Sequence, residues 1–255
     1  MASADPLMPT LTEDTLLDGR VKLTQPEYGY RVAIDPVLLA ASVPAKPGER
    51  VLDVGAGSGA VALCLACRVP DVRIDGIELQ TSLFTLAQRN IYQNRLEARL
   101  SIRLGNLLDP PPSFCSGTYD HVMANPPHLN AAKGSRPQHE GRRIAHLESG
   151  VCLSDWVRFA LRMVKPKGTL TFLHRFDRLE ELIALLAEDL GATRVLPLRT
   201  NARKSPKRVL VQGRKGVQGR PSHANTLLLQ DDKGAYTPQI EAVLRKGAAL
   251  PLILL

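Results

Sequence analysis

The chain alternates short apolar runs with segments whose apolar residues recur every three to four positions, a pattern typical of repeated β-α units. Strands are predicted where apolar and β-branched residues follow one another over a few positions, and helices where the spacing widens. The predicted strands are 51–54, 73–78, 99–104, 119–124, 169–174, 193–198 and 208–212, with 225–230 as a further candidate. The predicted helices are 37–42, 60–67, 81–94, 154–164, 177–190 and 237–247, and residues 165–168 are predicted to form a turn.

Repeated β-α units predict an α/β fold with a doubly wound, mostly parallel seven-stranded sheet of the Rossmann-like kind. A short loop joins the last two strands, which are therefore expected to form an antiparallel C-terminal hairpin. Near the N-terminus, Asp18-Gly19 is the dipeptide of a type I′ turn and predicts a small β-hairpin. We divide the chain into an N-terminal hairpin region, 1–45, and a core domain, 46–255.

The first core strand leads into three glycines at alternate positions, Gly55, Gly57 and Gly59. Glycine is needed where the backbone bends sharply and a ligand comes close. The spacing lacks the third glycine of the dinucleotide fingerprint G-x-G-x-x-G. The second strand ends in Glu78, placed to accept both hydroxyls of a ribose. With Asp53, this stretch resembles the adenosine-binding site of class I S-adenosylmethionine (SAM) methyltransferases, and a structural turn or a nicotinamide site is the alternative.

Three further positions are candidates for the same cofactor site. Asn106 follows the third strand, where an adenine ring would rest, and its carbonyl oxygen can accept a hydrogen bond from the adenine amino group. Arg31 and Asp35 lie in the polar segment before the first core strand, which can cover the methionine end of SAM. Asp35 is explained equally well as the N-cap of the helix that begins with Pro36.

The tetrad Asn125-Pro126-Pro127-His128 follows the fourth strand, at the edge where open α/β sheets bind ligands. Proline donates no hydrogen bond, which leaves the Asn125 side-chain oxygen and the Pro126 carbonyl as paired acceptors. Two acceptors on one NH₂ group free its lone pair for attack on a methyl group and stabilise the charge that develops. The tetrad resembles the N-P-P-(Y/F) motif of amino-methyltransferases, with His128 at the position that stacks on a flipped base. The alternative is a strand-ending turn.

The formal net charge of +8 suits a polyanionic partner. Basic residues gather in two segments that are expected to flank the cleft. The first segment contains Lys133, Arg136, Arg142 and Arg143, and the second contains Arg199, Arg203, Lys204, Lys207 and Arg208. Lysine and arginine bind phosphates whatever the base sequence, so nucleic acid, and tRNA above all, is the expected partner. Each cluster alone is equally well explained as a solvated face.

The apolar segments and the cysteines of the chain indicate which other partners, such as a membrane or a metal, are expected. No segment approaches the roughly 20 apolar residues of a membrane span, and the first residues lack the pattern of a signal peptide. We therefore expect a cytoplasmic enzyme, monomeric or homodimeric, that binds no membrane. Cys64 and Cys67 form a C-x-x-C without a second ligand pair, so we interpret them as core cysteines rather than as a zinc or redox site, and we expect no metal.

The order of the motifs resembles that of bacterial tRNA1(Val) adenine-N6 methyltransferases, from about Thr12 to Leu244. The matching segments are Gln25-Pro26, Gly29-Tyr30-Arg31, Asp35-Pro36-Val37-Leu38-Leu39, Asp53–Gly59, Asn125-Pro126-Pro127, Ala145-His146-Leu147-Glu148 and Pro206–Leu210. The resemblance implies SAM-dependent methylation of the adenosine beside the anticodon of a valine tRNA, although His128 and Asn106 depart from the usual pattern.

Two other functions remain open from the sequence. The first is methylation of another amino group: protein glutamine, as in release-factor methyltransferases, or a base of rRNA or DNA. The short segment before the glycine turn leaves little room for the extra helical domain that release-factor methyltransferases carry. The second is a nucleic-acid-binding protein that keeps the fold without turnover, and the presence of Asp53, Glu78 and Asn125 argues against it.

Overall fold

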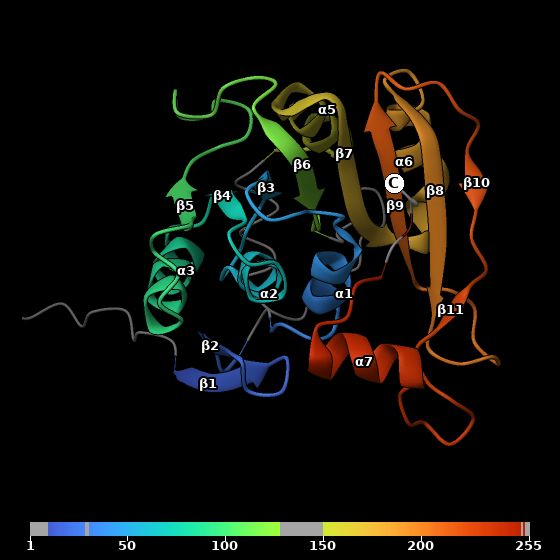
Figure 1. Cartoon of the computed structure of the whole chain (residues 1–255), viewed down its shortest axis with the longest axis horizontal. Coiled ribbons are helices and arrows are strands. Elements are labelled where there is room, and N and C mark those ends of the chain that lie inside the picture. Colours follow the sequence, from blue (N-terminus) through green and yellow to red (C-terminus); the bar gives the residue numbers. More distant parts are fainter. Residues whose placement is uncertain (1–9, 29–30, 128–149, 251, 253–255) are drawn as a thin grey trace, which may run out of the picture.

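The computed structural model describes residues 10–28, 31–127, 150–250 and 252 of the 255-residue chain. Its centre is a mostly parallel sheet in the order β10-β8-β9-β7-β6-β3-β4-β5, with β11 also paired to β8 (Figure 1). The strands are β3 (Arg50–Val54), β4 (Arg73–Glu78), β5 (Leu100–Leu104), β6 (Tyr119–Ala124), β7 (Val164–Arg175), β8 (Leu190–Arg199), β9 (Arg208–Lys215), β10 (Ser222–His223) and β11 (Leu227–Leu228). The seven predicted strands and the antiparallel pair β8–β9 are confirmed, and two short edge strands join them.

Helices cover both faces of this sheet. One face is covered by α1 (Asp35–Ser42), α2 (Ala60–Arg68), α3 (Thr81–Gln93) and α7 (Pro238–Lys246), and the other by α5 (Leu153–Met163) and α6 (Leu179–Leu186). Side chains alternate between the two cores along a strand, as in β3, where Val51 joins the first core and Leu52 the second. Within the described ranges, none of the helices is long and apolar enough to cross a bilayer.

The predicted N-terminal hairpin is present as β1 (Leu11–Leu16) and β2 (Val21–Pro26). Asp18 and Gly19 form its turn with φ of 57° and 82°, as a type I′ turn requires. The hairpin is fastened to α3 by Asn90, whose carbonyl oxygen accepts from Thr24 N at 2.7 Å. The Asn90 amide donates at 2.9 Å to the carbonyls of Thr24 and Ser58, so one buried side chain joins the hairpin to the glycine turn. The division at residues 45 and 46 stays a prediction.

Four local predictions were wrong. Residues 165–168 belong to β7 as a bulge rather than a turn, because Tyr119 pairs with Val164 while His121 pairs with Thr169. Helix α6 ends at Leu186 and not at 190, and Asp177 lies in a 3-10 turn, η1 (Phe176–Arg178), where its carboxylate accepts from Arg175 instead of capping α6. The N-cap of α3 is Gln80, one residue before the predicted Thr81.

Candidate functional site

The carboxyl ends of three neighbouring strands meet at the centre of the sheet. Val54, the last residue of β3, is paired with one residue of β4 and one of β6. The next residue in each chain segment therefore lies at the same level: Glu78 is the last residue of β4, and Gly55 and Asn125 directly follow β3 and β6. Because adjacent strands lie about 4.8 Å apart, Glu78 and Asn125 flank the glycine turn within one side-chain length.

The glycine turn has the shape that the sequence predicts. Gly55, Gly57 and Gly59 have φ of 69°, 57° and 86°, a region that other residues adopt only at a cost. A Cβ added to Gly57 would meet no heavy atom within 4 Å, so open space lies over the middle of the turn. Gly59 is the N-cap of α2, and the backbone amides of this helix terminus favour an electron-rich group.

Two carboxylates stand beside the turn. Glu78 accepts from the backbone amides of Gly57 at 2.7 Å and Gln80 at 2.8 Å, which fixes its orientation. Burial raises the pKa of Glu78, and those amides oppose the rise. Asp53 is only 1% exposed, and its Oδ2 has no hydrogen-bond partner among the described residues. Burial and then the charge of Glu78 raise the pKa of Asp53 to about 8, against a hydrogen bond from the Ala62 backbone.

Asn125 presents a second buried acceptor. Its Oδ1 is enclosed by protein and has no hydrogen-bond partner in the part of the chain that the structure describes. Buried amide oxygens are normally satisfied, so an orphaned one points to a group that binds there. Pro126 is buried and Pro127 is exposed, while His128 lies outside the described residues. The open turn and the two orphaned oxygens fit a SAM molecule with an amine beside it.

The other predicted cofactor residues have protein partners. Asn106 Oδ1 accepts from Leu108 N at 2.9 Å, within its own turn after β5. The Arg31 guanidinium donates to Thr12 Oγ1 at 2.8 Å, to the Pro26 carbonyl at 2.9 Å and to Asp14 at 2.9 Å, all in the hairpin. This network ties the segment after β2 back to the hairpin. A cofactor contact of Arg31 or Asn106 stays a prediction.

The N-cap interpretation of Asp35 was wrong. Ile34 is the N-cap of α1, Asp35 is its first residue, and no side chain caps the helix. The Asp35 carboxylate instead accepts from Arg208 Nε at 3.1 Å. This ion pair joins the start of α1 to the start of β9 at the carboxyl edge of the sheet, and a contact of Asp35 with the cofactor stays a prediction.

Sequence reasoning missed Trp156, the one tryptophan of the chain. A Cβ added to Gly55 would lie 2.3 Å from Trp156 Cη2, so the indole ring rests directly on the glycine turn. Trp156, Phe159 and Met163 follow the three-to-four-residue spacing of the inner face of α5. That spacing predicts a buried side chain, although it does not show which loop the ring touches.

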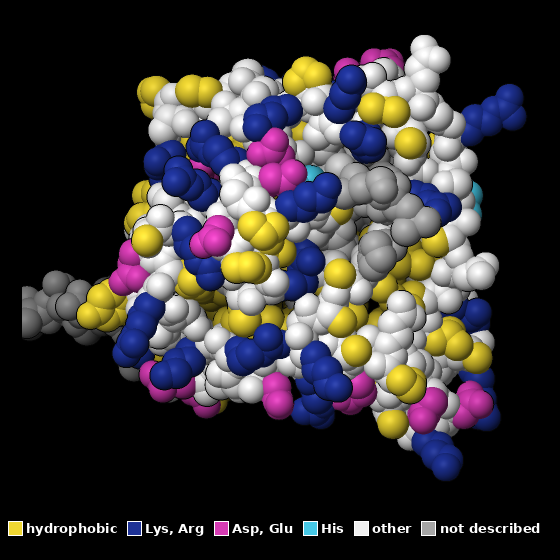
Figure 2. Space-filling model, viewed as in Figure 1, with side chains coloured by type: hydrophobic (Ala, Val, Ile, Leu, Met, Phe, Trp, Pro, Cys, Tyr) yellow, Lys and Arg dark blue, Asp and Glu magenta, His cyan; other side chains and the backbone are white. Residues whose placement is uncertain are grey.

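The second basic segment lies at the same edge of the sheet as the glycine turn. It forms the loop between β8 and β9, and since β8 runs parallel to β6 the loop follows the carboxyl end of β8. Arg203, Lys204 and Lys207 are exposed there. The first segment, with Lys133, Arg136, Arg142 and Arg143, lies outside the described residues. Lysine and arginine are scattered over the face shown in Figure 2, so net charge alone does not locate a binding surface.

Comparison with known proteins identifies the class of protein to which this fold belongs. The family model of the methyltransferase small domain matches residues 31–141. A predicted O-methyltransferase from Agrobacterium tumefaciens superposes with a TM-score of 0.71 at 20% identity, covering 86% of this chain and 100% of its own. The superposition shows a Rossmann-like fold, and these matches together with the sequence relatives make the protein a SAM-dependent methyltransferase whose cofactor is SAM.

Sequence relatives give a narrower assignment. A tRNA1(Val) (adenine(37)-N6)-methyltransferase from Porphyromonas gingivalis is 30% identical over 241 residues, which cover 91% of this chain and 92% of the relative. One of the same name from Trichodesmium erythraeum is 25% identical over 234 residues, with coverages of 88% and 92%. The chain belongs to the tRNA1(Val) (adenine(37)-N6)-methyltransferase family.

Proposed function

We propose that this protein transfers the methyl group of SAM to the exocyclic N6 of adenine 37 in tRNA1(Val), the reaction for which its relatives are named. The observation that supports it most is Asn125 Oδ1, a buried acceptor without a described partner, one strand away from the glycine turn. Methylation of a tRNA would place the enzyme in the cytoplasm with its substrate.

Asn125 and Pro126 supply the chemistry that an adenine amine needs. The N6 lone pair is delocalised into the ring and is a poor nucleophile. SAM supplies an electrophilic methyl group on its sulfonium. Asn125 Oδ1 and the Pro126 carbonyl would each accept one amine hydrogen, which favours a pyramidal nitrogen and directs its lone pair toward the methyl group. The same two oxygens stabilise the positive charge that nitrogen gains, and the product then loses a proton without a strong base.

The β8–β9 loop favours RNA over a peptide substrate. Its end, at β9, lies two strands from β6 and Asn125, and its start, at β8, lies three strands away, or roughly 10 and 14 Å along the plane of the sheet. Arg199 Nε donates to the Lys204 carbonyl at 2.6 Å, which folds the loop on itself while Arg203, Lys204 and Lys207 stay exposed. Three exposed cations beside a site for an amine suit the phosphates that flank a target base. Stacking by His128 and phosphate binding by residues 133–143 complete this proposal as predictions.

Radiolabelled methyl transfer tests the proposal. The purified protein is incubated with labelled SAM and unmodified valine tRNA, and the same tRNA with guanine at position 37 is the matched control. Label in N6-methyladenosine from the first RNA alone supports the proposal. Label in rRNA or DNA but not in tRNA would show that tRNA is not the substrate and that the target base lies in one of those nucleic acids. Label in glutamine of a release factor, with none in RNA, would refute methylation of RNA.

A further inference from the structure

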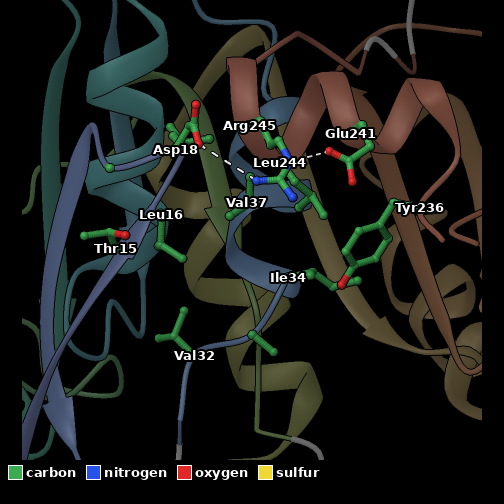
Figure 3. Close-up of a pocket in the computed structure, with 13 residues that line it drawn as sticks. Thr15, Leu16, Asp18, Val32, Ile34, Val37, Tyr236, Glu241, Leu244 and Arg245 are labelled. Atoms are coloured by element: carbon green, nitrogen blue, oxygen red, sulfur yellow. Dashed lines mark hydrogen bonds and ion pairs between the residues drawn. The ribbon is translucent and has the colours of Figure 1, made fainter. Parts of the chain in front are cut away.

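A cavity of about 370 Å³ lies apart from the glycine turn and is lined by three parts of the chain (Figure 3). One wall is the turn of the N-terminal hairpin, another is the segment that leads into α1, and the third is the start and inner face of α7. Its volume falls in the range of small-ligand sites. Its apolar lining comes mainly from Leu16, Val32, Ile34, Val37 and Leu244.

The polar groups of the cavity are few and lie together. Arg245 stands between two carboxylates, Glu241 of α7 at 2.5 Å and Asp18 of the hairpin turn at 3.9 Å (Figure 3). Tyr236 adds an aromatic ring whose hydroxyl reaches toward Ile34 in the same view. Arg20 donates to the carbonyls of Leu17 and Arg245 beside them, so two carboxylates face two guanidiniums and no net positive charge remains for an anion. The cavity therefore disfavours a phosphate and favours an uncharged, flat group that donates hydrogen bonds.

The walls of the cavity continue into the basic β8–β9 loop. The strand before Tyr236 pairs with the start of that loop, because Leu229 N donates to the Arg199 carbonyl and Gln230 N to the Thr200 carbonyl, both at 2.8 Å. On the other wall, the residue after Ile34 is Asp35, which is bonded to Arg208 at the end of the loop. A strand of RNA with its phosphates on the loop would therefore pass the mouth of the cavity.

We infer that this cavity receives an unpaired base of the same RNA, other than the base that is methylated, and that it selects a base with an exocyclic amine. The inference rests on the proposed function. Unpaired bases in RNA loops turn outward, pack against aromatic rings and present their edges to side chains. Carboxylates accept hydrogen bonds from such amines, as Asp and Glu do from cytosine N4. Uracil has no exocyclic amine that could donate a hydrogen bond to these carboxylates, so it is the disfavoured occupant.

Abasic substitution tests this inference. A hairpin RNA with the anticodon arm of the valine tRNA is made with one loop base removed at a time, and the dissociation constant of each is measured for the wild-type protein. One position besides the target should weaken binding by about tenfold. At that position, uracil should bind as poorly as no base. In Tyr236→Ala and Glu241→Gln the penalty should shrink to less than threefold, whereas Glu180→Gln, the same change on α6, should keep it.

The outcomes separate this inference from the proposed function. Methylation of the hairpin with the same base penalties in every variant would overturn the cavity inference alone and leave the cavity to a different occupant. Wild-type protein that neither binds nor methylates the hairpin would overturn both. Glu241→Gln preserves the size of its side chain, so its result stands even where Tyr236→Ala lowers the melting temperature.

Discussion

Gly55→Ala is the substitution whose cost this structure defines most closely. Gly55 has φ of 69°, and a Cβ there would lie 2.3 Å from Trp156 Cη2 and 2.8 Å from Cζ3. Gly57, two residues later, has φ of 57°, and its added Cβ would meet no heavy atom within 4 Å. The two alanine substitutions therefore share the backbone strain and differ in the collision with the indole ring.

The difference in stability between these two variants follows from two contributions. A left-handed backbone costs an alanine roughly 1–2 kcal/mol, which applies at both positions. At Gly55 the ring must also move by more than an ångström, and overpacking of this kind costs roughly 1–3 kcal/mol more. For a chain of this size each kcal/mol lowers the melting temperature by about 2–4 °C. We expect Gly55→Ala to melt roughly 2–12 °C below Gly57→Ala.

Thermal unfolding of the SAM-free proteins, followed by circular dichroism, measures this difference. The pair is then repeated with Trp156→Leu, which removes the colliding ring and keeps an apolar side chain. In that background the two alanine variants should lose equal stability, and the coupling between positions 55 and 156 should equal the original gap. Equal melting temperatures in the wild-type background would refute the reasoning. A difference in melting temperature that persists in the Trp156→Leu background would refute it as well.

Three further predictions concern the site. Asn125→Ala should lower kcat by about 10²–10³-fold while the dissociation constant for SAM stays within a few-fold, as measured by single-turnover transfer and calorimetry; comparable turnover would disprove its role. SAM carries positive charge and should favour the ionised form of Asp53, whose pKa is raised to about 8, so binding near pH 7 should release protons and tighten as the pH rises toward 8. Calorimetry in phosphate and in Tris measures that release, and Asp53→Asn should abolish the difference between buffers. Replacing Arg203, Lys204 and Lys207 by alanine should reduce the slope of log affinity for tRNA against log salt by roughly 2, and an unchanged slope would exclude this loop.

The sequence predicted the fold well because its strands are buried on both faces and its turns have distinctive residues. Mostly apolar runs such as 51–54 identify central parallel strands, and Asp18-Gly19 fixes a hairpin turn through local φ preferences. Helix ends were less accurate. Asp35 and Asp177 both look like N-caps, yet each carboxylate is bonded to an arginine instead, and one of the two partners is 173 residues away in the chain.

Part of the candidate site was also predicted from the sequence, because its residues lie at the ends of buried strands. Asp53 and Glu78 lie at the carboxyl ends of β3 and β4, and the glycine turn and Asn125 directly follow β3 and β6, so topology alone brings them together. Trp156 could not be placed on Gly55 from its spacing, since the contact depends on how α5 packs on the sheet. The cavity beside Tyr236 was missed because it is formed by the hairpin and α7, which come from opposite ends of the chain.

Hydrogen bonding distinguishes two asparagines of this molecule, one that stabilises the fold and one that is a candidate for catalysis. Asn90 and Asn125 are both asparagines with enclosed amide oxygens, but every polar atom of the Asn90 side chain is bonded to the hairpin, α3 or the glycine turn. The Asn125 Oδ1 has no described partner, and such an atom costs a folded protein roughly 1–3 kcal/mol. Asn90→Ala should therefore lower stability by several kcal/mol, because it leaves three buried backbone groups unpaired. Asn125→Ala, which removes an acceptor without a described partner, should lower kcat as predicted above without lowering the melting temperature.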